Sequence, residues 1–306
     1  MDTMRQEITD IPARAVEFLA EAPDYRLPLN VPYLGMGSSY FAPLAFKYMG
    51  VAIAPEMASE YCNYLAGAEP REQAVILSQS GRSSEALWAR RLFKQYVAIT
   101  NAPDSPLSQA EHAVQRIDLR AGPEQYSSSK TYVNTLLALF RGFGMDTTSA
   151  VAVLAENMAQ YQAVGEQLAE AIHALLLTEK IHGIYVLGSG PNLATAYQAA
   201  LILSESTKLS VTGLPMAQYD HGPKETAVGS IVIQILAQGS NYERGQNLAH
   251  TVSAAGAHVF SIEEPAVSEA FSVLNNIVPF NWLAYFLSQR LGITETFVVG
   301  GKVTEV

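Results

Sequence analysis

An apolar run that ends in a hydroxyl-rich turn is the feature that most constrains the fold of this chain. Residues 75–77 read Val-Ile-Leu, the turn after them reads Ser-Gln-Ser-Gly-Arg-Ser, and a helical pattern begins near Glu85. This order predicts a strand, a tight turn and a helix N-terminus, where unpaired N–H groups and the helix dipole favour an anion. The side-chain donors of the turn are Ser78, Gln79, Ser80 and Ser83. We interpret the turn at residues 78–83, hereafter the cradle, as a phosphate site; the alternative is that its serines only cap the helix.

The same order of strand, donor-rich turn and helix occurs earlier, at residues 31–48. Its turn contains Gly37, Ser38 and Ser39. Further apolar runs predict strands at residues 51–54, 74–77, 96–101 and 114–119. Helical patterns separate these runs, so we expect an α/β fold with a doubly wound parallel sheet and a ligand site at the carboxyl ends of its strands.

The second half of the chain resembles the first. Residues 187–190 match residues 34–37 in pattern, and residues 216–217 match residues 57–58. We therefore expect two copies of one α/β unit, although short matches of this kind also arise by chance. The expected division is a helical lead-in at 1–24 and two domains at 25–160 and 161–306. Only the first copy keeps the cradle, and neither copy has the third glycine of a dinucleotide-binding turn.

Charge and composition exclude several classes of function. The formal net charge is −10, and no lysine or arginine cluster exceeds the pair Arg90-Arg91, so we expect no nucleic-acid partner. The single cysteine, Cys62, is typical of a reducing compartment, and no Cys/His spacing indicates a metal site. No apolar stretch reaches the roughly eighteen residues of a membrane span, and no signal-peptide core begins the chain. We expect a cytoplasmic protein with no membrane partner.

Three titratable residues are candidates for catalysis. Glu205 is the only carboxylate in the apolar helical stretch 193–208, where burial would raise its pKa and suit it to act as a general base; the alternative is an exposed Glu205 paired with Lys208. His221 lies in a loop framed by glycine and proline, and Asp220 could tune it. Lys302 follows two glycines in what could also be a frayed tail.

Taken together, these motifs resemble the sugar isomerase (SIS) domain family, specifically the tandem-SIS isomerase half of glucosamine-6-phosphate synthase and its stand-alone relatives. Residues 37–40 resemble the family's Gly-Thr-Ser-Tyr, residues 78–81 are its Ser-Gln-Ser-Gly, and residues 127–130 resemble its Ala-Ser-Thr-Lys. The resemblance covers nearly the whole chain and implies two tandem SIS domains, each a doubly wound parallel sheet flanked by helices. The substrate-binding residues that it implies are Gly37, Ser38, Ser39, Ser78, Gln79, Ser80, Ser83 and Ser128.

The resemblance also implies catalytic roles. Glu205 falls on the glutamate that moves a proton between C1 and C2 of the sugar. His221 falls on the histidine that opens the sugar ring, which the neighbouring subunit usually donates, and Lys302 on the lysine that reaches back to the substrate. A homodimer that shares His221 across subunits is implied, with no cofactor and no metal ion.

The implied activity is that of an enzyme acting on a sugar or amino-sugar 6-phosphate, by aldose–ketose isomerisation or with deamination as in glucosamine-6-phosphate deaminase. The alternatives are a fructosamine-6-phosphate deglycase and a phosphosugar-sensing module without turnover. No glutaminase domain or N-terminal cysteine is seen, so we do not expect a complete glutamine-dependent synthase. The chain departs from the family at Ile202, where the synthase has a lysine for Schiff-base chemistry, and at Gln218, where the family has a glutamate.

Overall fold

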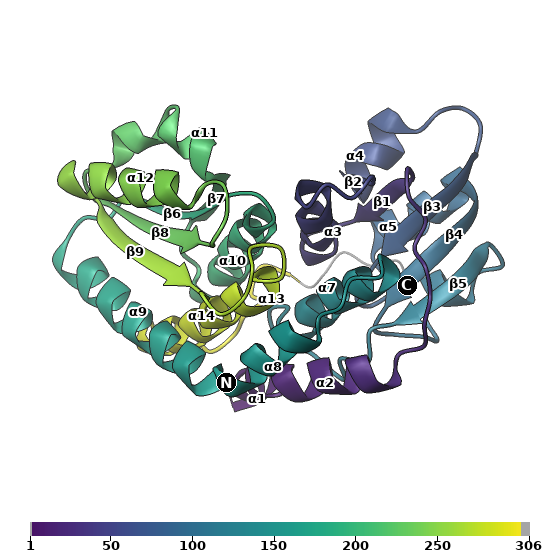
Figure 1. Ribbon diagram of the computed structural model, residues 1–306, viewed down its shortest axis with the longest axis horizontal. Helices are drawn as coiled ribbons and strands as arrows, with labels where there is room; N and C mark the ends of the chain where they lie inside the picture. Colours follow the sequence, from purple (N-terminus) through teal and green to yellow (C-terminus); the bar gives the residue numbers. More distant parts are fainter. Residues whose placement is uncertain (1, 301–306) are drawn as a thin grey trace. The chain divides into compact units, whose positions relative to one another are not determined.

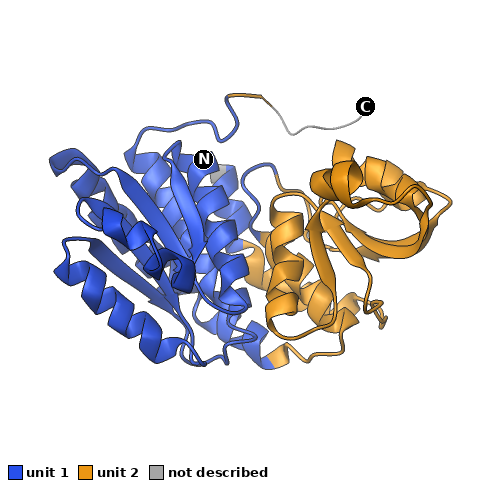
Figure 2. Cartoon of the chain, turned by 90° about the horizontal axis from the view of Figure 1, so that it is seen from above, with its two compact units in different colours: residues 1–9, 125–129, 149–298 blue, residues 10–124, 130–148, 299–306 orange. Residues whose placement is uncertain are grey.

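The computed structural model describes residues 2–300, which form two compact units (Figures 1 and 2). The first-sheet unit is built mainly from Asp10–Glu124 and Lys130–Thr148. The second-sheet unit is built from residues 2–9, Gln125–Ser129 and Ser149–Val298. The expected domain division at 1–24, 25–160 and 161–306 remains a prediction. The compact units instead divide near residue 149 and give residues 2–9 and 125–129 to the second-sheet unit.

The first-sheet unit contains a parallel sheet in the order β2-β1-β3-β4-β5. Its strands are β1 (Pro32–Gly35), β2 (Ala54–Met57), β3 (Arg71–Leu77), β4 (Phe93–Thr100) and β5 (Ala113–Asp118). The strand predicted at residues 51–54 lies three residues later, because the N–H of Ile53 bonds back to the carbonyl of Val51 at 2.8 Å and so closes a turn. Pro55 is tolerated in β2 because this strand is at the edge of the sheet.

Helices cover both faces of this sheet. They are α2 (Ile11–Glu21), α3 (Ser38–Tyr48), α4 (Ala58–Glu60), α5 (Ser84–Ala89), α6 (Pro106–Gln109) and α7 (Lys130–Gly142). Alternate strand residues face opposite ways, so Leu34 and Ile76 pack with Leu87 of α5 in one apolar core. On the other side, Phe46 of α3 and Phe140 of α7 meet edge to face, with ring centroids 4.7 Å apart.

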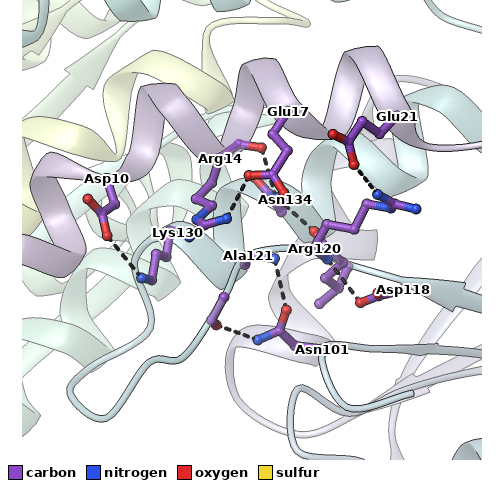
Figure 3. A network of polar contacts seen from close by, with 12 residues as sticks. Asp10, Arg14, Glu17, Glu21, Asn101, Asp118, Arg120, Ala121, Lys130 and Asn134 are labelled. Atoms are coloured by element: carbon purple, nitrogen blue, oxygen red, sulfur yellow. Dashed lines mark hydrogen bonds and ion pairs between the residues drawn. The ribbon is translucent and has the colours of Figure 1, made fainter.

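A polar network ties the chain after β5 to α2 and α7 (Figure 3). Asn134 of α7 donates one amide to the carbonyls of Leu119 at 2.8 Å and Arg14 at 3.2 Å. Asn101, at the end of β4, accepts the N–H of Ala121 at 2.9 Å. These bonds give main-chain groups side-chain partners, and they fix the exit of the chain from β5.

The second-sheet unit contains a parallel sheet in the order β7-β6-β8-β9. Its strands are β6 (Gly183–Gly188), β7 (Val211–Pro215), β8 (Ser230–Leu236) and β9 (His258–Glu263). Its helices are α1 (Asp2–Thr9), α8 (Thr148–Glu156), α9 (Met158–Thr178), α10 (Asn192–Thr207), α11 (Met216–Asp220), α12 (Tyr242–Ala254), α13 (Val273–Asn276) and α14 (Val278–Arg290). Helix α9 packs against α14 at Gly165, where a Cβ atom would lie 2.8 Å from the main-chain N of Leu283.

The predicted α/β class, with parallel sheets flanked by helices, is confirmed. Within residues 2–300, no helix has both the length and the apolar character that crossing a bilayer requires.

Candidate functional site

Two donor-rich turns leave the first sheet from neighbouring strands. Strands β1 and β3 pair in parallel with Tyr33 opposite Val75 and Leu34 opposite Ile76. The turn after β1 and the cradle after β3 therefore start at the same carboxyl edge, where ligands of parallel α/β sheets bind. Ser39, which the structure places at the start of helix α3, is half-buried, and its N–H bonds to the carbonyl of Met36 at 3.1 Å. This arrangement brings together serines that are about forty residues apart in sequence.

Inside the cradle, the hydroxyls bond to one another and to the turn. The Oγ atoms of Ser78 and Ser83 are 3.1 Å apart, and the Oγ of Ser80 accepts the N–H of Arg82 at 3.3 Å. Ser83 occupies the N-cap position of α5, yet its side chain makes no capping hydrogen bond. The interpretation that the serines only cap the helix therefore does not describe Ser83. Gln79 anchors the turn through its carbonyl, which accepts the N–H of Asn101 at 3.0 Å.

Glycines set the course of both turns. Gly37 has φ +50° and Gly81 has φ +61°, a region that side chains with a Cβ atom rarely adopt. A Cβ atom on Gly81 would also lie 1.9 Å from the Oγ of the buried Ser105. Gly81 is thus required by both conformation and space.

The predicted substrate residue Ser128 belongs to the second-sheet unit, on the segment Gln125–Ser129. The carbonyl of Ser128 accepts the side-chain amide of Gln198 at 3.1 Å, and the Oγ atoms of Ser127 and Ser206 are 3.0 Å apart. Gln198 and Ser206 are buried residues of α10, which also carries Glu205. The structure thus joins the segment of Ser128 to the helix of the candidate base.

Glu205 lies half-buried in the last turn of α10. The ammonium of Lys208 donates to the main-chain carbonyl of Glu205 at 2.6 Å and to the carbonyl of Thr296. Lys208 therefore caps the helix end, as cations do at helix C-termini. Ile202, where the family has a lysine, is 1% exposed in the apolar packing of the helix.

His221 is exposed at the C-cap of α11. Asp220 was predicted to tune His221. In the structure, the carboxylate of Asp220 instead accepts hydrogen bonds from Lys224 and Arg244, both at 3.0 Å. These bonds, first that of Lys224, hold the pKa of the Asp220 carboxyl below its usual value. Asp220 thus acts on this loop by fixing its position. Gln218, which replaces the family glutamate, is exposed.

Lys302 lies outside the described residues. Three residues that hold the segment of Ser128 were missed from the sequence: Glu7, Gln198 and Ser206. Only Glu7 left a signal, because it is a carboxylate within the apolar stripe of Met4, Ile8 and Ile11. Across residues 2–300, no group of three or more His, Cys, Asp and Glu side chains could hold a metal ion.

Comparison with solved structures defines the class of fold. The C-terminal domain of glucosamine-fructose-6-phosphate aminotransferase from Francisella tularensis superposes with a TM-score of 0.78 at 18% identity, covering 95% of this chain and 96% of that chain. Glucosamine-6-phosphate deaminase from Thermotoga maritima gives 0.76 at 20% identity, covering 95% and 96%. Tagatose-6-phosphate ketose/aldose isomerase from Escherichia coli gives 0.69 at 15% identity, covering 94% and 93%. The fold is therefore that of phosphosugar isomerases and deaminases.

Sequence comparison points to particular relatives. Glutamine–fructose-6-phosphate aminotransferase [isomerizing] of Pyrobaculum aerophilum is 27% identical over 303 aligned residues, which cover 86% of this chain and 49% of that protein. The enzyme of the same name from Sulfolobus acidocaldarius is 26% identical over 298, covering 86% and 48%. The chain thus spans about half the length of the curated relatives that it matches. No protein-family model matches the chain.

Proposed function

We propose that this protein is a phosphosugar isomerase-type enzyme that acts on a sugar or amino-sugar 6-phosphate. Its sequence relatives carry fructose-6-phosphate and isomerisation in their names, which supports this class of substrate. The observation that carries the proposal is the bonding of the Ser128 segment to α10, the helix of Glu205. A residue proposed to bind substrate and a residue proposed to move its proton thus belong to one unit, although they are far apart in sequence.

In the proposed mechanism, the donors of the two turns bind the 6-phosphate. They are Gly37, Ser38, Ser39, Ser78, Gln79, Ser80 and Ser83, with Ser128 as a further contact. Hydroxyl and main-chain donors suit this task on an acidic protein, because a net charge of −10 gives no long-range attraction for phosphate. We propose that no cofactor and no metal ion takes part.

His221 opens the sugar ring by moving a proton between the ring oxygen and the anomeric hydroxyl. Glu205 then removes the proton from C2 of the open aldose, giving an enediol, or an enolamine for an amino sugar, and returns the proton to C1. With an amine at C2 the product is a ketimine, which water hydrolyses to a ketose and ammonia. Lys302 is proposed to reach the substrate.

The test is to incubate the protein with glucosamine-6-phosphate and follow ammonia and fructose-6-phosphate. We expect Glu205→Gln to lower kcat by about a thousandfold, within the range for removal of a general base. Glu166→Gln, an exposed glutamate of α9, is the matched control and should leave turnover unchanged. If no ammonia forms, NMR should detect solvent deuterium at C1 or C2 of other sugar 6-phosphates, as expected for an isomerase or a fructosamine-6-phosphate deglycase. No exchange with any of them would contradict the proposal.

We further propose a cytoplasmic homodimer in which His221 serves the site of the partner subunit. The exposure of His221 is consistent with such a role. Mixing inactive Glu205→Gln and His221→Ala proteins should then restore about a quarter of wild-type activity, because half of the dimers are mixed and each has one intact site. If both residues serve the site of their own subunit, the mixture stays inactive.

One observation favours a second candidate, a phosphosugar sensor without turnover. Ile202 is buried where the family has a lysine, so no amine is available there for a Schiff base. Isomerisation through an enediol needs no such amine, and for this reason we place the enzyme first. Binding of sugar 6-phosphates with no deuterium exchange would identify the sensor.

A further inference from the structure

A buried carboxylate in the first helix holds the segment that carries Ser128. Glu7 of α1 is only 4% exposed. One of its carboxylate oxygens accepts the N–H of Gln125 at 2.6 Å, and the other accepts the N–H of Tyr126 at 3.2 Å. A carboxylate can be buried at low cost only when charged hydrogen bonds replace its water, and these two main-chain donors supply them. Helix α1 is thus bound to a segment 118 residues further along the chain.

The same segment is held from a second direction by α10. The hydroxyl of Ser127 pairs with that of Ser206, the residue after Glu205, and the amide of Gln198 donates to the carbonyl of Ser128. Ser127 and Ser206 are 5% and 1% exposed, whereas Ser128 between these contacts is half-buried. The main chain of Ser128 is therefore fixed by its neighbours while its side chain stays partly accessible.

We propose that Glu7 is a positioning residue, which sets the main chain of Gln125–Ser129 so that the hydroxyl of Ser128 meets the substrate. This inference rests on the proposed function. Only one side-chain torsion, χ1, separates the hydroxyl of a serine from its main chain, so the main chain largely decides the position of the hydroxyl. Binding groups lose much of their effect when misplaced by about 1 Å. Glu7 acts on the substrate only through Ser128.

The chemistry of the contact explains why a glutamate is needed. Two N–H donors converge on one side chain, and a carboxylate offers an acceptor oxygen to each. Glutamine has the same shape but only one acceptor oxygen, so its NH₂ group would face an N–H. Glu7→Gln therefore loosens the segment without creating a cavity.

A matched control is available in the next helix. Glu17 of α2 forms an ion pair with Arg14 at 2.6 Å, and its side chain is 37% exposed. Glu17→Gln removes the same charge from a neighbouring part of the sequence. It breaks a surface ion pair of small value and leaves the segment untouched.

The experiment measures the Kd of fructose-6-phosphate by calorimetry for the wild type, Glu7→Gln, Ser128→Ala, the double variant and Glu17→Gln. We expect Glu7→Gln and Ser128→Ala each to weaken binding by about tenfold, the size of one charged hydrogen bond. In the double variant, Glu7→Gln should add less than about twofold to the loss from Ser128→Ala, because both act through one hydroxyl. In turnover assays of Glu7→Gln and Ser128→Ala, KM should rise while kcat changes by less than about threefold. Glu17→Gln should match the wild type in Kd, KM and kcat.

Circular dichroism checks that each variant folds. If Glu7→Gln does not, Ser206→Ala replaces it in the same cycle, with a smaller expected loss of about threefold and the same non-additivity with Ser128→Ala. The positioning role alone would be overturned if the folded Glu7→Gln variant bound fructose-6-phosphate with wild-type affinity. It would also be overturned if the losses from Glu7→Gln and Ser128→Ala added in full in the double variant. Failure of the wild type to bind any sugar 6-phosphate would overturn the proposed function, and this inference with it.

Discussion

The two sheets show the same turn after their first strand in chain order but different chemistry after their third. A Cβ atom on Gly35 would lie 2.5 Å from the carbonyl oxygen of Ser39, and one on Gly188 would lie 2.1 Å from that of Asn192. The next glycines, Gly37 and Gly190, have φ +50° and +53°. In both units, the start of the following helix therefore packs so closely on the end of the strand that only a glycine fits there.

The turns after β3 and β8 differ in what surrounds them. The first carries the Ser78–Ser83 hydroxyl pair. The second meets a carboxylate, since a Cβ atom on Gly239 would lie 2.1 Å from Oε2 of Glu269. Burial raises the pKa of the Glu269 carboxyl. A phosphate would meet hydroxyl donors at the turn after β3 and a like charge at the turn after β8. Side chains therefore distinguish these two turns as places for an anion.

Removing the cradle hydroxyls is expected to have the largest effect on this difference. The double variant Ser78→Ala, Ser83→Ala should weaken binding of fructose-6-phosphate by at least about a hundredfold, because two hydrogen bonds to a charged group are lost. Stability should change little, since the two hydroxyls partner each other and both are removed. Calorimetry measures the loss, with Ser240→Ala in the exposed second turn as the control. Equal losses from both variants would mean that the two turns do not differ as described.

Glycine substitutions probe the backbones of the same two turns. Gly81→Ala should lower the free energy of unfolding by about 2 kcal/mol, because φ is +61° and Ser105 leaves no room. Gly239→Ala should cost less than about 1 kcal/mol, because it meets only the end of a flexible, half-buried glutamate. Urea denaturation compares the two, and a larger cost at Gly239 would contradict the comparison.

The carboxyl of Glu269 should make stability depend on pH. Its pKa is raised in the folded state, so its contribution is complete below the pKa of the unfolded chain and is lost as pH rises through the folded value. Glu269→Gln imitates the protonated form and should raise Tm slightly at pH 7, with an effect under about 1 kcal/mol because the group is partly exposed. At pH 4 the variant and the wild type should melt together. A lower Tm for the variant at pH 7 would show that the ionised carboxylate is stabilising.

Ion pairs hold the loop of His221, whereas main-chain hydrogen bonds hold the cradle. Asp220 holds this loop through exposed ion pairs with Lys224 and Arg244. Asp220→Asn should lower kcat by about twofold and leave the Kd of fructose-6-phosphate unchanged, since such ion pairs contribute little. A change in Kd that exceeds the change in kcat would contradict this separation.

Much of the fold could be predicted from local patterns. The apolar run before Ser78 and the glycines of the turns identified strands and helix starts, because strand burial and positive φ angles depend on nearby residues. The strand at residues 51–54 was misplaced because an edge strand lacks a strong alternating pattern, and β2 begins at Ala54 instead.

Sequence by itself determined the α/β class and the turn at residues 78–83, since each depends on a short stretch of chain. It also nominated Glu205 and His221, whose roles stay predictions. Only the tertiary structure decided that Gln125–Ser129 belongs with α10, that Glu7 binds two of its N–H groups, and that Glu269 lies against Gly239. The physical reason is the same for the first two. A buried polar group must find a partner, and here that partner lies tens of residues away or more, where no local pattern records it.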